Sequence, residues 1–579
     1  MRLRILKNII FSLFLVLFFD VFWIQIIKGP EYARQSETNR IRLVPEEASR
    51  GIIYDRNHVP LVKNKLVFDV VAVPQEIDTD NREALFSKLS TFLDIDCEVL
   101  ADTFAFNSGS GFSPVMLVSD VPKATAFLIE QDADQLSGIF IKARAMRLYI
   151  HGRTTAHLIG YVGKMREDEY PELKKYGYRI KDVVGRSGLE KSFDKILRGK
   201  PGGMQLEVDS EGKIVNVLSY RPPVRGSDVH TTIDINLQQM LAELVGESKG
   251  AVVVMDADSG DILGMYSGPS FDPNVIIAKK NFIEIGKILK DTSAPLLNRN
   301  LKAYPAGSIF KIITAYAGLR ERVIGIHDSF YCSGEFVIGN STRHCWLRRG
   351  HGNVNIVRAL TTSCNVFFWE VGLKVGQKML SRYAEEFGLG KVTHVELNGE
   401  HSGLVPNARW KNTELHQRWY AGDTANFSIG QGYLLISPLQ ALQMVALLAN
   451  GGREVRPHIV RRHDIPEKSK RILSQEVIAV INRGMRQVVN SVDGTGHRAF
   501  IEGEEVFAKT GTAQVANGTA HAWFIGYTVI ERKKICFAVF LEHGGHGGER
   551  PAEIAKQIVM YVHETSRQQT SDTRHQTPQ

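Results

Sequence analysis

The sequence is poor in cysteine and has no run of basic residues interleaved with aromatic ones. Five cysteines among 579 residues are too few for a disulfide scaffold, and their odd number leaves at least one of them unpaired. The formal net charge is +8, but a nucleic-acid-binding surface needs a concentrated basic patch, which is lacking here. We therefore expect no nucleic-acid partner. The mild basic excess suits a protein that works beside anionic lipid or an anionic wall polymer.

Long hydrophobic runs are also scarce, and a single one is long enough to cross a membrane. Residues 9–27 are nearly all apolar, and a helix of this length spans about 28 Å, enough for a bilayer core. Arg2, Arg4 and Lys7 precede it, which predicts a cytoplasmic N-terminus and an exported remainder. A cleaved signal peptide is the alternative, but Lys28-Gly29-Pro30 follows the run instead of a small-residue cleavage site. The pattern favours a single-pass anchor.

The first exported half contains no nucleophile paired with a base at a useful spacing. Residues 66–74 read as a strand and residues 81–135 carry helical patterns. His157 precedes two apolar residues, which is typical of a hydrogen-bonded core histidine and not of a ligand. We interpret this half as a non-catalytic domain that ends at a proline-rich linker over residues 221–226.

The second half carries a candidate nucleophile. Pro305 and Gly307 precede an apolar run at helical spacing, so a buried helix is expected to begin near Ser308. Ser308 and Lys311 would share one face of its first turn, where a lysine with a lowered pKa could take the proton of the serine hydroxyl. The same Ser-x-x-Lys spacing occurs at two other places in the chain, so alone it predicts little.

Two further motifs follow in order. Ser363-Cys364-Asn365 comes 55 residues after Ser308, and Lys509-Thr510-Gly511 lies on a predicted strand over residues 506–513. The order Ser-x-x-Lys, Ser-x-Asn, Lys-Thr-Gly is the motif set of penicillin-binding proteins and class A β-lactamases. A hairpin is predicted upstream, over residues 250–266.

The chain resembles the class B penicillin-binding proteins, and within them the penicillin-binding protein 2 group. First-half segments resemble the pedestal motifs of that family: Arg50-Gly51 with Asp55-Arg56-Asn57, Gly160-Tyr161-Val162-Gly163, and Gly188-Leu189-Glu190. The resemblance implies an α+β fold, with a transpeptidase domain (an antiparallel sheet between helices) on a β-rich pedestal and one N-terminal transmembrane helix. The expected segments are 1–28 (cytoplasmic tail and anchor), 29–225 (pedestal or dimerisation domain), 226–565 (transpeptidase domain) and 566–579 (disordered tail).

The same resemblance implies a serine-type D-Ala-D-Ala transpeptidase, with possible carboxypeptidase activity, that crosslinks peptidoglycan stem peptides during bacterial cell elongation and is acylated by β-lactams. Ser308 would attack the penultimate D-alanine and Lys311 would be the base, while Ser363 and Asn365 would relay a proton and hold the substrate amide. Lys509 with Thr510, Gly511 and Thr512 would bind the terminal carboxylate. The backbone N–H groups of Ser308 and Thr512 would form the oxyanion hole. No cofactor is expected for the chemistry.

Expected partners are a SEDS-family glycosyltransferase and elongation-complex proteins at the inner membrane, with the catalytic domain in the periplasm. Three alternatives remain open: a septal transpeptidase of division, a β-lactam-sensing or β-lactam-hydrolysing protein, and a non-catalytic scaffold.

A second constellation consists of Cys332, Cys345, His351 and Cys364. Cysteine and histidine are the ligands of closed tetrahedral zinc sites, and elongation-type relatives bind zinc here. The alternatives are a Cys332–Cys345 disulfide, which an exported protein could form, or plain buried thiols. The segment His543–Gly548 also has a metal-like appearance, but we interpret it as the glycine-rich end of a strand before a helix.

Overall fold

The computed structural model describes residues 2–32, 41–78, 80–107, 114–180, 182–208, 214–278, 282–462, 469–516 and 518–575. It divides into two compact units that interleave along the chain. The first unit is Met1–Gly51, Asn64–Met146 and Lys195–Ser227, and the second is Ile52–Lys63, Arg147–Asp194 and Asp228–Gln579. Two segments of the predicted pedestal thus lie in the second unit. Their hydrogen bonds explain this, since Tyr149 exchanges backbone hydrogen bonds with the Asn274 side chain at 2.9 and 3.0 Å.

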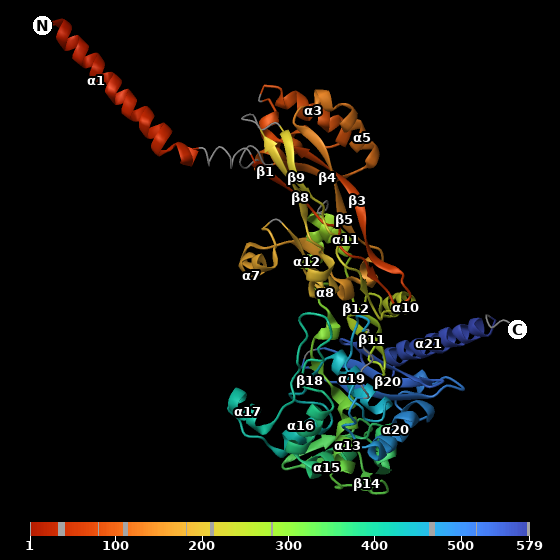
Figure 1. The fold of residues 1–579 in the computed structure, drawn as a ribbon. Coiled ribbons are helices and arrows are strands. Elements are labelled where there is room, and N and C mark those ends of the chain that lie inside the picture. The colour runs from red at the N-terminus through yellow and green to blue at the C-terminus, as the bar shows by residue number, and fades with distance from the viewer. Residues whose placement is uncertain are drawn as a thin grey trace. The chain divides into compact units, whose positions relative to one another are not determined.

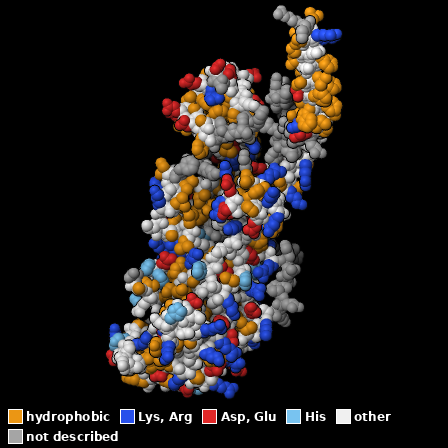
Figure 2. All heavy atoms as spheres, turned by 90° about the vertical axis from the view of Figure 1, so that its left-hand side faces the viewer, with side chains coloured by type: hydrophobic (Ala, Val, Ile, Leu, Met, Phe, Trp, Pro, Cys, Tyr) orange, Lys and Arg blue, Asp and Glu red, His pale blue; other side chains and the backbone are white. Residues whose placement is uncertain are grey.

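The predicted anchor is a helix. α1 spans Arg2–Phe22 and continues as a π-helix over Trp23–Ile27. Its apolar side chains are exposed, and Figure 2 shows hydrophobic side chains covering its surface. Among the described residues, Leu3–Ile27 is the one helix long and apolar enough to cross a membrane, as the sequence predicts.

Besides α1, the first unit combines strands with helices. A sheet of order β1-β8-β9 joins Ile41–Glu46, Gly202–Val208 and Ile214–Arg221. The predicted helical region contains α3 (Arg82–Leu93), α4 (Cys97–Asn107) and α5 (Lys123–Gln131), but a strand interrupts it, β4 (Val115–Val121). Phe86, Leu100 and Val115 share one apolar core that these helices cover. The long strands β3 (Pro60–Ala72) and β5 (Ile139–Tyr149) each contribute residues to both units.

A five-stranded antiparallel sheet organises the second unit (Figure 1). Its order is β12-β11-β21-β20-β19, so β19 is an edge strand. The strands are β11 (Gly250–Asp256), β12 (Ile262–Gly268), β19 (Val506–Ala513), β20 (His521–Ile530) and β21 (Lys533–Leu541). The predicted hairpin is β11–β12, and the predicted Lys-Thr-Gly strand is β19. Nearly all residues of the sheet are buried, on both of its faces. Both faces therefore need apolar partners, and helices provide them.

Leu241 of α10 (Ile235–Val245) and Ile558 of α21 share an apolar core with alternate residues of the central strands. α19 (Pro438–Ala449) also packs on β11, β20 and β21. This confirms the sheet between helices. α21 spans Arg550–His575, whereas we predicted a disordered tail from residue 566. Extending a helix whose first turns are packed costs much less than starting one, so a polar continuation can remain helical. Residues 576–579 lie outside the described residues.

The remaining elements are short. The strands are β2 (Ile53–Tyr54), β6 (Val162–Lys164), β7 (Val183–Gly185), β10 (Val229–His230), β13 (Tyr304–Pro305), β14 (Ser329–Cys332), β15 (Glu335–Ile338), β16 (Ser341–His344), β17 (Gly352–Asn355) and β18 (Leu435–Ile436). The helices are α6 (Ala156–Ile159), α7 (Tyr170–Leu173), α8 (Gly188–Ser192), α9 (Asp194–Leu197), α11 (Pro273–Ala278), α12 (Phe282–Lys290), α13 (Lys311–Arg320), α14 (Ile356–Thr361), α15 (Asn365–Val375), α16 (Gln377–Glu386), α17 (Ala408–Leu415), α18 (Ala421–Ser428) and α20 (Gln475–Asn490).

Candidate active site and metal centre

The candidate nucleophile lies on a tight turn that leads into a buried helix. Ser308 is in the 3-10 turn Gly307–Phe310, and Lys311 is the first residue of α13, as predicted. Gly307 has φ +58°, and a Cβ there would lie 2.7 Å from the carbonyl oxygen of Thr512. Only glycine permits that approach, so Gly307 is what lets the nucleophile turn pack against the end of β19.

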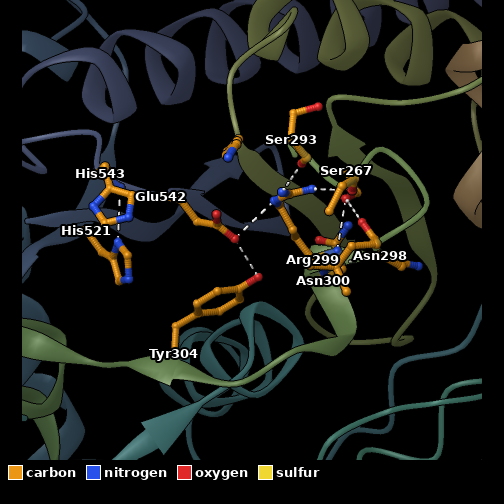
Figure 3. A network of polar contacts seen from close by, with 12 residues as sticks. Ser267, Ser293, Asn298, Arg299, Asn300, Tyr304, His521, Glu542 and His543 are labelled. Carbon is orange, nitrogen blue, oxygen red and sulfur yellow. Dashed lines mark hydrogen bonds and ion pairs between the residues drawn. The ribbon is translucent and has the colours of Figure 1, made fainter. Parts of the chain in front are cut away.

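A polar network positions the strand before this turn (Figure 3). Tyr304 donates a hydrogen bond to Glu542 Oε1 at 2.9 Å, and Arg299 Nε donates to the same oxygen at 3.1 Å. The Tyr304 ring packs on Phe540, with centroids 4.2 Å apart. The carboxylate of Glu542, at the end of β21, therefore ties the segment entering the nucleophile turn to the central sheet.

Ser363 and Asn365 lie at the junction between α14 and α15. Ser363 has φ +52°, a left-handed conformation that costs a non-glycine residue roughly 1 kcal/mol. In this conformation its carbonyl oxygen accepts a hydrogen bond from Lys311 Nζ at 2.7 Å, and its Oγ lies 3.2 Å from that nitrogen. Asn365 Oδ1 accepts from Lys311 Nζ at 2.6 Å. The strained turn thus surrounds one amine with three oxygen atoms.

Lys509 of β19 approaches the same hydroxyl from the opposite side. Its Nζ lies 2.9 Å from Ser363 Oγ and 3.0 Å from the Thr510 carbonyl oxygen. The Thr510 hydroxyl is 2.7 Å from that of Thr495. Ser363 Oγ therefore contacts the amines of both Lys311 and Lys509. The sequence could place these two lysines only on separate elements.

Burial shifts the proton equilibria of both lysines. Lys311 and Lys509 are fully buried, and neither takes part in an ion pair among the described residues. Burial lowers the pKa of Lys311 to about 8. Burial, reinforced by the charge of Lys311, holds the pKa of Lys509 well below its usual range. An amine with a pKa near 8 is partly neutral at physiological pH and can accept a proton.

The structure joins Lys311, Ser363, Asn365 and Lys509 in one hydrogen-bonded group. Ser308 lies on the adjoining turn, but within the described structure it is not hydrogen-bonded to this group. Among the described residues, no hydrogen bond is recorded for Ser308 Oγ, so its proton transfer to Lys311 rests on their placement three residues apart on the same turn. Contacts in catalytic sites are often long before substrate binds.

The four predicted metal ligands converge. One ligand atom from each of Cys332, Cys345, His351 and Cys364 lies within 4.8 Å of the others. Cys332 Sγ and Cys345 Sγ are each 3.6 Å from His351 Nδ1. Sulfur and nitrogen ligands at ordinary zinc distances and a tetrahedral angle would be about 3.5 Å apart. The donor set and its spacing therefore fit zinc, and all three cysteines are free thiols, without the alternative disulfide.

The Cys/His cluster contacts the catalytic turn directly. The backbone N–H of Asn365 donates to Cys345 Sγ at 3.3 Å, and Cys364 stands between Ser363 and Asn365. A hydrogen bond from Cys364, with help from His351 and Asn365, lowers the pKa of the Cys345 thiol to about 3. The same contact raises the pKa of Cys364. The cluster therefore favours the thiolate form of Cys345 beside the turn that holds Lys311.

Two groups near the site had no predicted role. Gln431 Nε2 donates to the Thr512 carbonyl at 3.4 Å, and Glu542 anchors Tyr304. Gln431 lies in a glycine-flanked loop, which was a sequence signal for close backbone approach, but nothing in the sequence indicated what it approaches. His543 begins the glycine-rich segment that looked metal-like in the sequence. Its backbone N–H donates to His521 Nδ1 at 3.0 Å, which is a structural contact.

Two family models match this chain. A penicillin-binding protein transpeptidase domain matches residues 250–560, and a penicillin-binding protein dimerisation domain matches residues 45–231. The peptidoglycan D,D-transpeptidase MrdA of Haemophilus influenzae is 31% identical over 94% of this chain and 89% of its own length. The MrdA protein of Escherichia coli K12 is 29% identical over 94% and 91%.

Solved structures agree with these sequence matches. The penicillin-binding protein PBP2 of Helicobacter pylori, in its complex with MreC, superimposes with a TM-score of 0.81 at 28% identity, covering 90% of this chain and 99% of that one. PBP2 of Pseudomonas aeruginosa in complex with WCK 5153 gives a TM-score of 0.68 at 26% identity, covering 90% and 96%.

Proposed function

Because this chain belongs to the class B penicillin-binding proteins, we propose that it is the peptidoglycan D,D-transpeptidase of cell elongation. The observation that carries the proposal is the meeting of Lys311 Nζ and Lys509 Nζ on Ser363 Oγ, beside the turn that bears Ser308. The MrdA relatives and the PBP2–MreC complex favour elongation over division.

In the acylation step, neutral Lys311 takes the proton of the Ser308 hydroxyl as its oxygen attacks the carbonyl carbon of the penultimate D-alanine. The depressed pKa of Lys311 provides the neutral amine, and Asn365 Oδ1 together with the Ser363 carbonyl holds it in place. The backbone N–H groups of Ser308 and Thr512 would stabilise the oxyanion. The close packing of Gly307 on Thr512 supports this pairing, because it brings the two donors to one place.

The C–N bond then breaks and the leaving amine needs a proton. Ser363 Oγ touches both lysines, so it can donate its proton to the amine and recover one from Lys311. The terminal D-alanine departs and leaves an ester on Ser308. An amine from a second stem peptide attacks this ester by the reverse sequence of proton transfers and forms the crosslink, while water in its place gives carboxypeptidase activity.

Substrate recognition falls to the outer edge of β19. Lys509 has no ion-pair partner among the described residues, and a bound terminal carboxylate would give it one and restore its positive charge. The hydroxyls of Thr510 and Thr512 would complete the carboxylate site, and Gly511 leaves room for the nucleophile turn, because a Cβ there would lie 2.9 Å from Ile309. A β-lactam would occupy the same contacts and leave a stable acyl group on Ser308.

We also propose that Cys332, Cys345, His351 and Cys364 hold a structural zinc ion. The 3.6 Å spacings and the thiolate character of Cys345 support it. A bound zinc ion would supply rigidity to the turn Ser363–Asn365 and would take no part in the chemistry. Metal analysis of the purified protein tests this, and well under half an equivalent of zinc per chain would contradict it.

For its setting, we propose that α1 anchors the protein in the inner membrane with the catalytic unit in the periplasm. The basic residues before the helix and its exposed apolar surface support this topology. A SEDS-family glycosyltransferase would supply nascent glycan strands, and an MreC-like protein is a further partner, as for the relative from Helicobacter pylori. Depletion should round the cells, whereas filamentation would indicate a division role.

The decisive experiment locates the penicillin adduct. Full-length protein in detergent is labelled with penicillin, digested with trypsin and analysed by mass spectrometry. The adduct should map to the tryptic peptide 303–311, and Ser308→Ala should not label. An adduct elsewhere, or none on folded protein, would contradict the proposal. Slow loss of the label would argue against a β-lactam-hydrolysing enzyme, and loss of crosslinking in cells that carry only Ser308→Ala would argue against a scaffold.

A further inference from the structure

Three thiols of the Cys/His cluster lie within reach of one another. The ligand atoms of Cys332, Cys345, His351 and Cys364 are all within 4.8 Å of each other, and each of the three cysteines is a free thiol. The topology proposed above places them in the periplasm, where disulfides form and persist. A two-electron oxidation of two such neighbouring thiols gives a disulfide.

Cys345 and Cys364 are the pair best placed to react. A hydrogen bond joins their sulfur atoms, so the two atoms are already in contact. The recorded contact of Cys332 is with His351 Nδ1, at 3.6 Å. Of the three thiols, Cys345 and Cys364 therefore need the smallest movement to form a bond.

Burial decides which oxidants can reach the pair. The three cysteines of the cluster are at most 1% exposed, whereas His351 is half-buried. Burial this complete excludes a bulky oxidant such as oxidised glutathione. The half-buried side of the cluster, at His351, is where a molecule as small as hydrogen peroxide can enter.

A bond between these sulfur atoms would disturb the turn that holds Lys311. Cys364 stands between Ser363 and Asn365, and Cys345 Sγ accepts the Asn365 backbone N–H at 3.3 Å. A disulfide bond is about 2 Å long, much shorter than a hydrogen-bonded contact between sulfur atoms, so both residues would have to move. The Ser363 carbonyl and Asn365 Oδ1, which accept from Lys311 Nζ at 2.7 and 2.6 Å, would move with them.

We propose that Cys345 and Cys364 form an oxidative modification site, at which a peroxide generates a disulfide that slows the acylation of Ser308. The cross-link itself goes beyond the transpeptidase function proposed above, and only its effect on acylation rests on that function. A zinc ion bound by the cluster would lose two of its four ligands in the same reaction.

The chemistry takes two steps. The Cys345 thiolate attacks one oxygen of hydrogen peroxide, the O–O bond breaks, and hydroxide leaves and is protonated to water, so Cys345 becomes a sulfenic acid. The Cys364 sulfur then attacks the Cys345 sulfur, the S–O bond breaks, and the hydroxyl group leaves with the thiol proton of Cys364 as water. Overall, the two sulfur atoms lose two electrons, and one peroxide gains them and becomes two water molecules.

Mass spectrometry detects the cross-link directly. Full-length protein in detergent is treated with hydrogen peroxide, its remaining thiols are blocked with N-ethylmaleimide, and it is digested with trypsin without reduction. Cys332, Cys345 and Cys364 fall in separate tryptic peptides, 323–343, 344–348 and 359–374. Peptides 344–348 and 359–374 should appear joined, lighter than their sum by two hydrogen atoms. Oxidised glutathione at the same concentration should join none of the three.

Fluorescent penicillin measures the consequence for Ser308. Acylation should slow by about 10²-fold in proportion to the cross-linked fraction, the effect of displacing a catalytic group by about 1 Å. Dithiothreitol should restore it. In zinc-loaded protein, a colour-forming chelator should register metal release together with the cross-link. The mass measurement does not depend on the metal, so it also tests metal-free protein.

Substitutions assign the effect to the pair. Cys345→Ser should prevent both the cross-link and the slowing of acylation by peroxide. Cys332→Ser removes the third thiol of the cluster and should keep both, when acylation is compared before and after peroxide. Cys97→Ala, in the first unit, is the matched control and should respond as the unaltered protein does. If Cys345→Ser fails to fold, the peptide masses of the unaltered protein and of Cys332→Ser decide the question.

The outcomes separate this proposal from the enzyme assignment. Peptide 323–343 joined to 344–348 in place of the expected pair, or sulfinic acids without any cross-link, would overturn the assignment of Cys345 and Cys364. A cross-link that leaves the acylation rate unchanged would show that it does not control Ser308. If penicillin does not label Ser308 of the reduced, folded protein, the transpeptidase function is wrong, whereas the cross-link is still decided by mass.

Discussion

Two buried polar clusters share the turn Ser363–Asn365, and they treat charge in opposite ways. On one side, Lys311 and Lys509 form no ion pair with a carboxylate among the described residues. Burial therefore lowers the pKa of both amines, although the charges of Cys345 and Cys364 offset part of the effect at Lys311. On the other side, hydrogen bonds from Cys364 and His351 lower the pKa of the Cys345 thiol within a set of four candidate metal ligands. The first arrangement produces reactivity, and the second is suited to an incoming cation that fixes the turn. This comparison implies that the lysine pair supplies the basic amine and that the Cys/His cluster supports the turn, and each role can be tested.

The largest effect should come from removing the base. Lys311→Met should lower the rate of Ser308 acylation by about 10³-fold, within the range for loss of a general base, as measured with fluorescent penicillin. The same substitution should raise the free energy of unfolding. The folded-state pKa of Lys311 is about 8, below the usual 10.5, so the unfolded chain binds this proton more tightly and burial costs up to about 3 kcal/mol below pH 8.

Methionine avoids that cost but leaves Asn365 Oδ1 and the Ser363 carbonyl without their donor, a loss of about 1 kcal/mol each. The free energy of unfolding at pH 7 should therefore rise by about 1 kcal/mol. Lys374→Met, on the surface side of α15, is the control and should change acylation little. A large drop in stability for Lys311→Met would mean that the amine is structural and that the comparison of the two clusters is wrong.

The next effect concerns the metal side of the turn. Cys332→Ala removes the ligand furthest along the chain from Ser363 and should abolish zinc binding, with roughly tenfold slower acylation, because the turn loses its outer support. Zinc content by mass spectrometry and the melting temperature should fall together. Cys97→Ala, a half-buried cysteine of the first unit, should keep both. Acylation that survives complete loss of zinc would separate the two clusters.

A third prediction uses pH to probe the amine side alone. If neutral Lys311 is the base, the acylation rate should rise about tenfold per pH unit below pH 8 and level off above it, since its pKa is about 8. The same titration should make the folded state more stable as the pH rises from about 8 toward 10.5. In that range the unfolded chain still binds the proton that folded Lys311 has released, and the resulting advantage of the unfolded chain shrinks as protons become scarcer. A rate that is flat between pH 6 and 8 would contradict Lys311 as the base.

Much of this site was accessible from the sequence because its chemistry lies in short motifs. Ser308, Lys311, Ser363, Asn365 and Lys509 were each identified, and so were the four candidate metal ligands. The sequence could not show that Ser363 adopts a left-handed backbone, or that one hydroxyl contacts both amines, because these facts depend on contacts between residues 52 and 146 positions apart.

The fold shows the same limit. Periodicity identified the β11–β12 hairpin and the strand of the Lys-Thr-Gly motif. His157 is a half-buried histidine that is hydrogen-bonded to the Pro295 carbonyl at 2.8 Å, and desolvation lowers its pKa to about 4. The interleaving of the two units was not predictable, since it follows from long-range contacts such as that of Tyr149 with Asn274. Strand β4 was missed because it is short and stands between two helices. The helix past residue 566 was missed because polar composition says little about a helix that is already nucleated.

The smallest effect should come from the network that holds the nucleophile turn from behind. Tyr304→Phe removes one hydrogen bond to Glu542 and keeps the ring on Phe540, so the free energy of unfolding should fall by about 1 kcal/mol. Arg299 still binds Glu542 Oε1, which limits the displacement of Ser308, and acylation should slow only about threefold. The pH profile tells whether the effect is one of position: because Tyr304 does not contact Lys311, the midpoint near pH 8 should stay while the plateau rate falls. A shifted midpoint would show that this network also controls the proton affinity of the base, and the separation of positioning from basicity would have to be given up.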